Sequence, residues 1–122
     1  MNNTVVYKER KTYIKYDNEH YLLYLKEQQA IFTEQESETE YPGWSYTGEM
    51  ADGGTLIKAS ELSDENQRSK FISGLIATRY SIDDQLAILA NGKDTEGHMS
   101  EFAAFEQFRT DCKSEVDQML TR

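Results

Sequence analysis

Histidines are the first residues of this sequence that could bind a metal or act as a base, and their spacing supports neither role. Neither His20 nor His98 has a second His or Cys at the i+3 or i+4 spacing of a helical metal site, and Glu101 at i+3 is the nearest candidate for a ligand beside His98. We interpret His98 as a polar residue near a helix start and His20 as a residue beside a turn. The sequence therefore predicts no metal and no cofactor.

A cysteine and an acid pair are the remaining candidates for catalysis. Cys112 lies four residues before Val116 on an apolar stripe, where a cysteine behaves as a small hydrophobic residue, and Asp111 beside it would raise the thiol pKa. Asp83 and Asp84 fall in the first turn of a predicted helix, where the dipole and the cap explain them. We predict no catalytic residue and no enzyme.

Two further segments carry polar residues at regular spacing. Acids alternate through TEQESETE, residues 33–40, at Glu34, Glu36, Glu38 and Glu40. An extended segment would place all four on one face, where calcium or a basic partner could bind, but the absence of apolar residues favours a solvated loop. The tract ADGG, residues 51–54, lacks the Lys and Ser/Thr of a phosphate loop and is typical of a hairpin turn.

Aromatic side chains gather most densely at Tyr41, Trp44 and Tyr46. Such residues line ligand grooves and partner surfaces, although strand aromatics more often pack beneath helices. If the chain has a partner-binding face, we predict that it contains these three residues.

Charge and composition exclude several classes of partner. The chain has 122 residues and a net charge of -9, and neither half is basic, which argues against nucleic acid and anionic lipid. One cysteine allows no internal disulfide and suits a reducing compartment. No segment has the length of a signal-peptide core or the ~20 apolar residues of a membrane helix. We expect a cytoplasmic protein with no membrane partner.

The elements of the first half are predicted to be strands. Residues 4–16 alternate β-branched or aromatic residues with charges, which predicts a half-exposed strand. Residues 12–16 and 21–26 flank a turn, which predicts a hairpin. A helix over residues 19–33 competes, because many of these residues are good helix formers, but we favour strands. Residues 44–46 and 55–58 form a second predicted hairpin across the ADGG tract.

Capping signals divide the second half into helices. Ser63, followed by two acids, predicts a helix over about 64–79, and Ser81 opens a capping box for a helix over 82–91 that ends at Asn91-Gly92. A third helix is predicted over about 98–120. In the second helix one face is shared by Ile82, Leu86 and Leu89, and the stripe of the third contains Met99, Phe102, Phe105, Cys112, Val116 and Met119.

Strands followed by helices indicate an α+β fold rather than an alternating parallel-sheet fold. We expect antiparallel β-hairpins over about residues 4–58 to pack against the three helices. The length predicts one domain, residues 1–122, with a β-rich part over 1–60 and a helical part over 61–122.

Five features follow one another between residues 71 and 115: Arg79-Tyr80-Ser81, Asp83-Asp84, Ala87-Ile88-Leu89, an aromatic-rich stretch over 102–108, and Cys112-Lys113. This region resembles the C-terminal helical region of small uncharacterised proteins encoded in phage and prophage-like regions. The resemblance implies a gene near tail or tail-fibre genes, and hence a virion-associated component or an assembly accessory. It supplies no catalytic residue.

We expect a non-enzymatic phage or prophage protein that binds another protein, with a phage structural protein as the suspected partner. An acidic DNA mimic that inhibits a DNA-binding protein is an alternative, because the net charge is -9 on a small chain. A small enzyme of unrecognised type is the third. The oligomeric state stays open.

Overall fold

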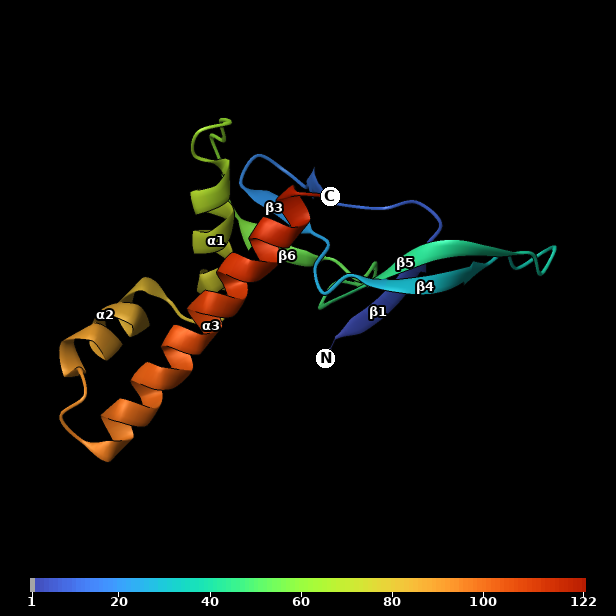
Figure 1. Cartoon of the computed structure of the whole chain (residues 1–122). Coiled ribbons are helices and arrows are strands. Elements are labelled where there is room, and N and C mark those ends of the chain that lie inside the picture. Colours follow the sequence, from blue (N-terminus) through green and yellow to red (C-terminus); the bar gives the residue numbers. More distant parts are fainter. Residues whose placement is uncertain (1) are drawn as a thin grey trace. The chain divides into compact units, whose positions relative to one another are not determined.

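The computed structural model describes residues 2–122 and confirms the α+β class, with six antiparallel strands in two sheets followed by three helices over that range (Figure 1). The elements are β1 (Asn3–Tyr7), β2 (Tyr13–Lys15), β3 (His20–Leu23), β4 (Gln28–Thr33), β5 (Glu40–Gly48), β6 (Thr55–Lys58), α1 (Gln67–Ala77), α2 (Ile82–Asn91) and α3 (Glu96–Leu120).

The chain divides into two compact units, which are described separately below. Unit 1 contains the residues up to Leu56 together with Met119–Arg122, and unit 2 contains Ile57–Gln118. The chain therefore leaves unit 1 within β6 and re-enters it at the end of α3. That residues 1–122 form one domain stays a prediction.

The first sheet lies in unit 1 and has the strand order β1-β5-β4. β4 and β5 form a hairpin, and the predicted loop between them is confirmed, closed by hydrogen bonds from the Glu34 N–H to the Thr39 carbonyl (3.0 Å) and from the Glu38 N–H to the Glu34 carbonyl (2.9 Å). Glu34, Glu36 and Glu38 lie between the two strands and Glu40 is the first residue of β5, so the four acids do not form the single acidic face of an extended strand.

The second sheet has the order β2-β3-β6. Its β2–β3 hairpin, with Tyr13 opposite Leu23, confirms both the first predicted hairpin and the choice of strands over a helix for residues 19–33. The single predicted strand over residues 4–16 is wrong, because β1 and β2 belong to different sheets. Four consecutive charged residues, 8–11, interrupt the alternation that would keep one apolar face in register.

The second predicted hairpin is also wrong. The turn itself forms, with the Met50 N–H bonded to the Gly54 carbonyl at 3.1 Å and Gly53 at a φ of 82°. However, β5 is already paired on both sides by β1 and β4, so β6 joins the other sheet instead.

An aromatic core stabilises unit 1. Its buried members are Leu22, Tyr24 and Tyr46, and partly buried side chains pack against them from Tyr7, Trp44, Met50 and Leu56. The rings of Tyr24 and Tyr46 meet edge to face at 5.7 Å. Trp44 and Tyr46 both belong to β5, and Trp44 also lines the candidate site.

Local capping fixes α2 as predicted. The Asp84 N–H bonds to Ser81 Oγ at 3.0 Å and the Ser81 N–H bonds to Asp84 Oδ2 at 3.3 Å, and Gly92 ends the helix at a φ of 62°. The prediction for α1 is less accurate, because Ser63 and Asn66 bond to each other in a turn of their own and the helix begins only at Gln67.

The α3 helix carries the core of unit 2, and part of its predicted stripe is confirmed. Phe105, Cys112 and Val116 are buried, whereas Met99 is exposed and Phe102 is only half-buried. Arg68 of α1 bonds through Nε to Asp117 Oδ1 of α3 at 2.6 Å. In α2 only Ile88 is buried, so the face shared by Ile82, Leu86 and Leu89 is turned to solvent.

Gly74 allows α1 to approach β6, and we expect Gly74→Ala to destabilise unit 2. A Cβ at this buried glycine would lie 2.6 Å from the Lys58 carbonyl oxygen and 3.1 Å from Ile57 Cδ1. Alanine normally favours a helix by up to ~1 kcal/mol over glycine, but overpacking costs about 1–3 kcal/mol. Thermal unfolding followed at 222 nm should show a lower midpoint.

Gly97→Ala in α3 is the matched control, because the nearest atom to its added Cβ is Thr95 Oγ1 at 3.9 Å. This variant should be neutral or stabilising. Equal stabilisation by both substitutions would contradict the close approach at Gly74.

Candidate functional site

A hollow of about 330 Å³ lies on one face of the first sheet, lined by Gln29, Ala30, Ile31, Pro42, Gly43 and Trp44. Strand register explains its composition. Gln29 pairs with Trp44 and Ile31 with Pro42, and directly opposed residues project from the same face of a sheet. The hollow is therefore walled by β4 and β5 and is largely apolar.

The predicted aromatic cluster is divided by the sheet. Trp44 is half-buried and lines the hollow, whereas Tyr46 is 0% exposed and belongs to the core. Tyr41 projects from the opposite face, where the Lys8 ammonium lies 3.8 Å from its ring centroid. Of the three residues predicted to contact a partner, the structure brings only Trp44 to this hollow.

Ile31 also lines the hollow, and no pattern in the sequence predicted this position. It is 59% exposed, although a large aliphatic side chain on a strand usually lies in the core. An uncharged strand such as QQAIFT indicates only that β4 is extended, and the face that Ile31 occupies follows from the pairing with Pro42. Register is a tertiary property, so no local signal could have placed it.

β4 is an edge strand without the usual protection. It is the last strand in the order β1-β5-β4, and over residues 2–122 no further strand pairs with its outer side. Its six residues include no Lys, Glu, Asp, Arg or Pro. Natural edge strands commonly carry such residues because an unprotected edge pairs with other chains. The hollow therefore lies beside an edge that can accept another strand.

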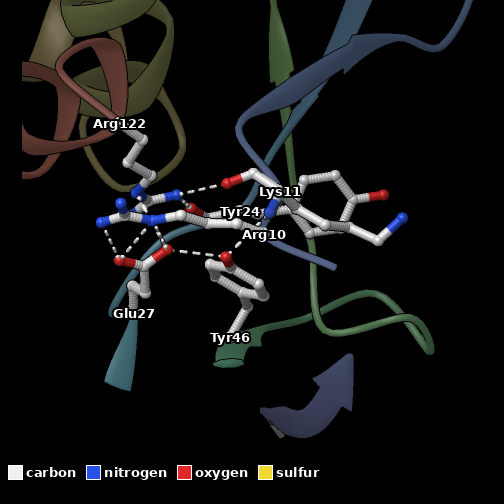
Figure 2. A network of polar contacts seen from close by, with 6 residues as sticks. All are labelled: Arg10, Lys11, Tyr24, Glu27, Tyr46 and Arg122. Atoms are coloured by element: carbon white, nitrogen blue, oxygen red, sulfur yellow. Dashed lines mark hydrogen bonds and ion pairs between the residues drawn. The ribbon is translucent and has the colours of Figure 1, made fainter. Parts of the chain in front are cut away.

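A largely buried carboxylate, Glu27, binds side chains from three other segments next to the start of β4 (Figure 2). Glu27 comes directly before β4 and accepts hydrogen bonds from Arg10 Nη2 at 2.7 Å and from Tyr46 Oη at 2.6 Å. Arg122 Nε lies 3.3 Å from the same carboxylate, and the side chain of Arg122 is 3% exposed. Two guanidinium groups thus share one acid.

The Arg122 side chain also binds the backbone of two segments. Its Nη1 donates to the carbonyl oxygens of Tyr24 at 2.5 Å and Lys11 at 3.0 Å, and its guanidinium lies 5.2 Å from the centre of the Tyr46 ring. The Lys11 N–H completes the network by donating to Tyr46 Oη at 2.9 Å. The network fixes Tyr46 and, with it, the position of Trp44 two residues earlier in β5.

The network sets the protonation of its members. Burial raises the pKa of Glu27, but the hydrogen bonds from Arg10 and Tyr46 and the charge of Arg122 outweigh burial and hold it below its ordinary value. Burial, followed by the hydrogen bond to Glu27, raises the pKa of Tyr46 to about 12. At neutral pH Glu27 is therefore the charged acceptor and Tyr46 the neutral donor.

This arrangement predicts acid sensitivity. A carboxylate with a lowered folded-state pKa contributes stability that is present above its unfolded pKa and is lost as the pH falls through the folded value. The difference in free energy of unfolding between the wild type and Glu27→Gln should therefore shrink progressively below a pH of about 4. Urea titrations from neutral to acidic pH measure it, and a difference that stays constant on acidification would contradict the assignment.

The histidines pair with carboxylates that precede them. His20 Nδ1 lies 2.9 Å from Asp17 Oδ1 and His98 Nδ1 lies 2.5 Å from Asp94 Oδ1, so the partner of His98 is Asp94 rather than the predicted nearest candidate Glu101. The two pairs are in different units. Over the described range no group of three or more His, Cys, Asp or Glu side chains is arranged to hold a metal ion.

The remaining candidates have structural surroundings. Burial, then Asp111 and Glu115, raises the pKa of the Cys112 thiol to about 11, and a neutral buried thiol is a poor nucleophile. Asp84 completes the capping box of α2, and Asp83 lies exposed in the first turn. Asp52 Oδ1 accepts the Gly54 N–H at 2.9 Å, which closes the turn of the glycine tract.

No protein-family model, curated protein or solved structure matches this chain. Within residues 2–122 no helix is long and apolar enough to cross a membrane.

Proposed function

We propose that this protein is a non-enzymatic accessory of phage or prophage type that binds an extended segment of a partner protein beside β4. One observation carries the proposal: the exposed Ile31, together with Pro42 and Trp44, forms an apolar hollow next to an unprotected edge strand. Apolar hollows with aromatic walls are typical of binding surfaces.

The geometry favours an extended segment over a helix. A segment added to the outer side of β4 gains backbone hydrogen bonds, and alternate side chains of the segment project to the face of the sheet that holds Ile31. There a large apolar side chain would contact Ile31, Pro42 and Trp44. Backbone pairing would supply affinity, and the hollow would select the side chain.

The phage context is supported by the resemblance of residues 71–115, which implies a virion component or an assembly accessory. A surface that captures strands suits such a role, because subunits of an assembly often exchange strands at their edges. We therefore propose a phage structural protein as the partner.

Site-specific photo-crosslinking tests the surface in the intact chain. A photoreactive amino acid at position 31 should give one discrete crosslinked adduct in cells that carry the phage or prophage encoding this protein. The same residue at position 14 is the matched control, because Ile14 is also exposed, at 55%, and lies on β2 in the other sheet. Identical adducts at both positions would contradict binding at the hollow, and a host protein in the adduct would overturn the phage assignment.

The adduct partner can then be titrated directly. Trp44 is the single tryptophan of the chain, so its emission reports occupancy of the hollow. Ile31→Ser should weaken binding by roughly tenfold or more, since one well-packed apolar anchor is worth more than 1 kcal/mol, whereas Ile14→Ser should leave it unchanged. Equal affinities for the two variants would rule out the hollow as the contact surface.

A further inference from the structure

The α2 helix presents its large apolar residues to solvent. Ile82, Leu86 and Leu89 are 66%, 60% and 55% exposed, and their spacing of four and three residues places them in one stripe along the helix. The single buried residue of α2, Ile88, lies on the other side. An amphipathic helix in a folded domain normally packs such an apolar stripe against the core.

The start and the end of α2 are set by contacts that do not involve the stripe. The Ser81 and Asp84 capping box fixes the start of α2 and Gly92 fixes its end. Gln85 Nε2 donates to the Tyr80 carbonyl at 3.1 Å, which attaches α2 to the segment that follows α1. The exposure of the stripe is therefore a built feature of unit 2, and contiguous exposed apolar residues on such a feature mark an interaction surface.

Apolar residues repeating at four and three positions form the seam by which one helix packs on another. A helical occupant is therefore favoured over an extended one, since the spacing of the stripe matches the turns of a helix and not the two-residue repeat of a strand.

The charge of α2 and of the whole chain selects the chemistry of that helix. α2 carries Asp83 and Asp84 and no Lys or Arg, and the full chain has a formal net charge of -9. The first basic residue after α2 is Lys93, whose ammonium lies 4.9 Å from the centre of the Phe102 ring. A second copy of this chain would bring like charge to the seam, whereas a basic helix would gain from the juxtaposition.

We propose that the stripe of Ile82, Leu86 and Leu89 binds a basic amphipathic helix of a partner protein, one with leucine-like residues along its seam and Lys or Arg on its flanks. This surface shares no residue with the hollow beside β4, so it is a second binding site and not a refinement of the first. The full chain would then have one site for an extended segment and one for a helix.

Three labelled peptides of about three heptads test the proposal by fluorescence anisotropy on the full chain. The first has leucine at the seam and lysine on the flanks, the second replaces the lysines with glutamates, and the third keeps the lysines but has serine at the seam. The first should bind, and the other two should bind at least tenfold more weakly. If the peptide with glutamates or the peptide with serine at the seam bound as tightly as the first peptide, the proposal would be overturned.

A double variant, Leu86→Ser with Leu89→Ser, should weaken binding of the first peptide by at least tenfold, whereas Ile14→Ser and Ile31→Ser should not. Because both leucines are exposed, the variant should keep the helical signal at 222 nm. Binding that survives the double variant would show attraction by charge alone and would refute the seam. A dimer seen by sedimentation in the wild type and lost in the variant would instead assign the stripe to a second copy.

Discussion

Glu27→Ala is expected to lower the free energy of unfolding by about 3–5 kcal/mol, the usual cost of removing one partner from a buried ion pair. The side chain of Glu27 is 15% exposed and that of Arg122 is 3% exposed, so the substitution leaves a guanidinium charge buried beside the Tyr46 ring. It also removes the acceptor of the Tyr46 hydroxyl. Glu27→Gln keeps an acceptor and should cost less.

Urea titration followed by Trp44 fluorescence measures this loss, since Trp44 belongs to unit 1. Arg10→Ala is the control, because Arg10 binds the same carboxylate from the solvent side, with 48% of its side chain exposed. Arg10→Ala should lower the free energy of unfolding much less than Glu27→Ala does. Equal losses would show that Arg122 is not held by Glu27.

Phe105→Ala is expected to destabilise unit 2 by about 3–5 kcal/mol, because it empties a large buried volume that the surroundings fill only in part. Phe105 is 2% exposed, and the ring of Tyr80 meets it edge to face at 5.1 Å. The half-buried Phe102 lies three residues earlier on the same helix, so Phe102→Ala should cost about 1 kcal/mol. Equal costs would contradict the orientation of α3.

The helical signal at 222 nm reports this variant, because the helices lie mainly in unit 2. Comparing it with Trp44 emission also tests the predicted single domain. Coincident transitions from the two probes would establish one cooperative domain, and separate transitions would show that the units unfold independently.

Features that depend on neighbouring residues could be predicted from the sequence. The ends of α2 are set by Ser81, Asp84 and Gly92, and the β2–β3 hairpin is closed by the residues between its strands. The partner of β6 could not be predicted in this way. Its place was decided by β1, which occupies the side of β5 that a simple hairpin would have used. Strand pairing at long sequence separation leaves no local signal.

The candidate site shows the same division. The spacing of the aromatic residues predicted Trp44, but Tyr46 is buried against Leu22 and Tyr24, which lie in β3 and directly after it, and the face on which Ile31 lies follows from its register with Pro42. The stripe of α2 was visible as a periodic pattern. That it faces solvent was not, because periodicity shows that a helix has an apolar face and not what covers it.

The contacts of Arg122 have a consequence for the order of events on the ribosome. Its bonds to Tyr24 and Lys11 join residues that are 98 and 111 positions apart, so the strands of unit 1 leave the ribosome long before the guanidinium that completes their network. All of unit 2 is synthesised in the interval. Unit 1 therefore closes last although it begins first, and until Arg122 is synthesised Glu27 and Tyr46 lack the guanidinium that completes their network.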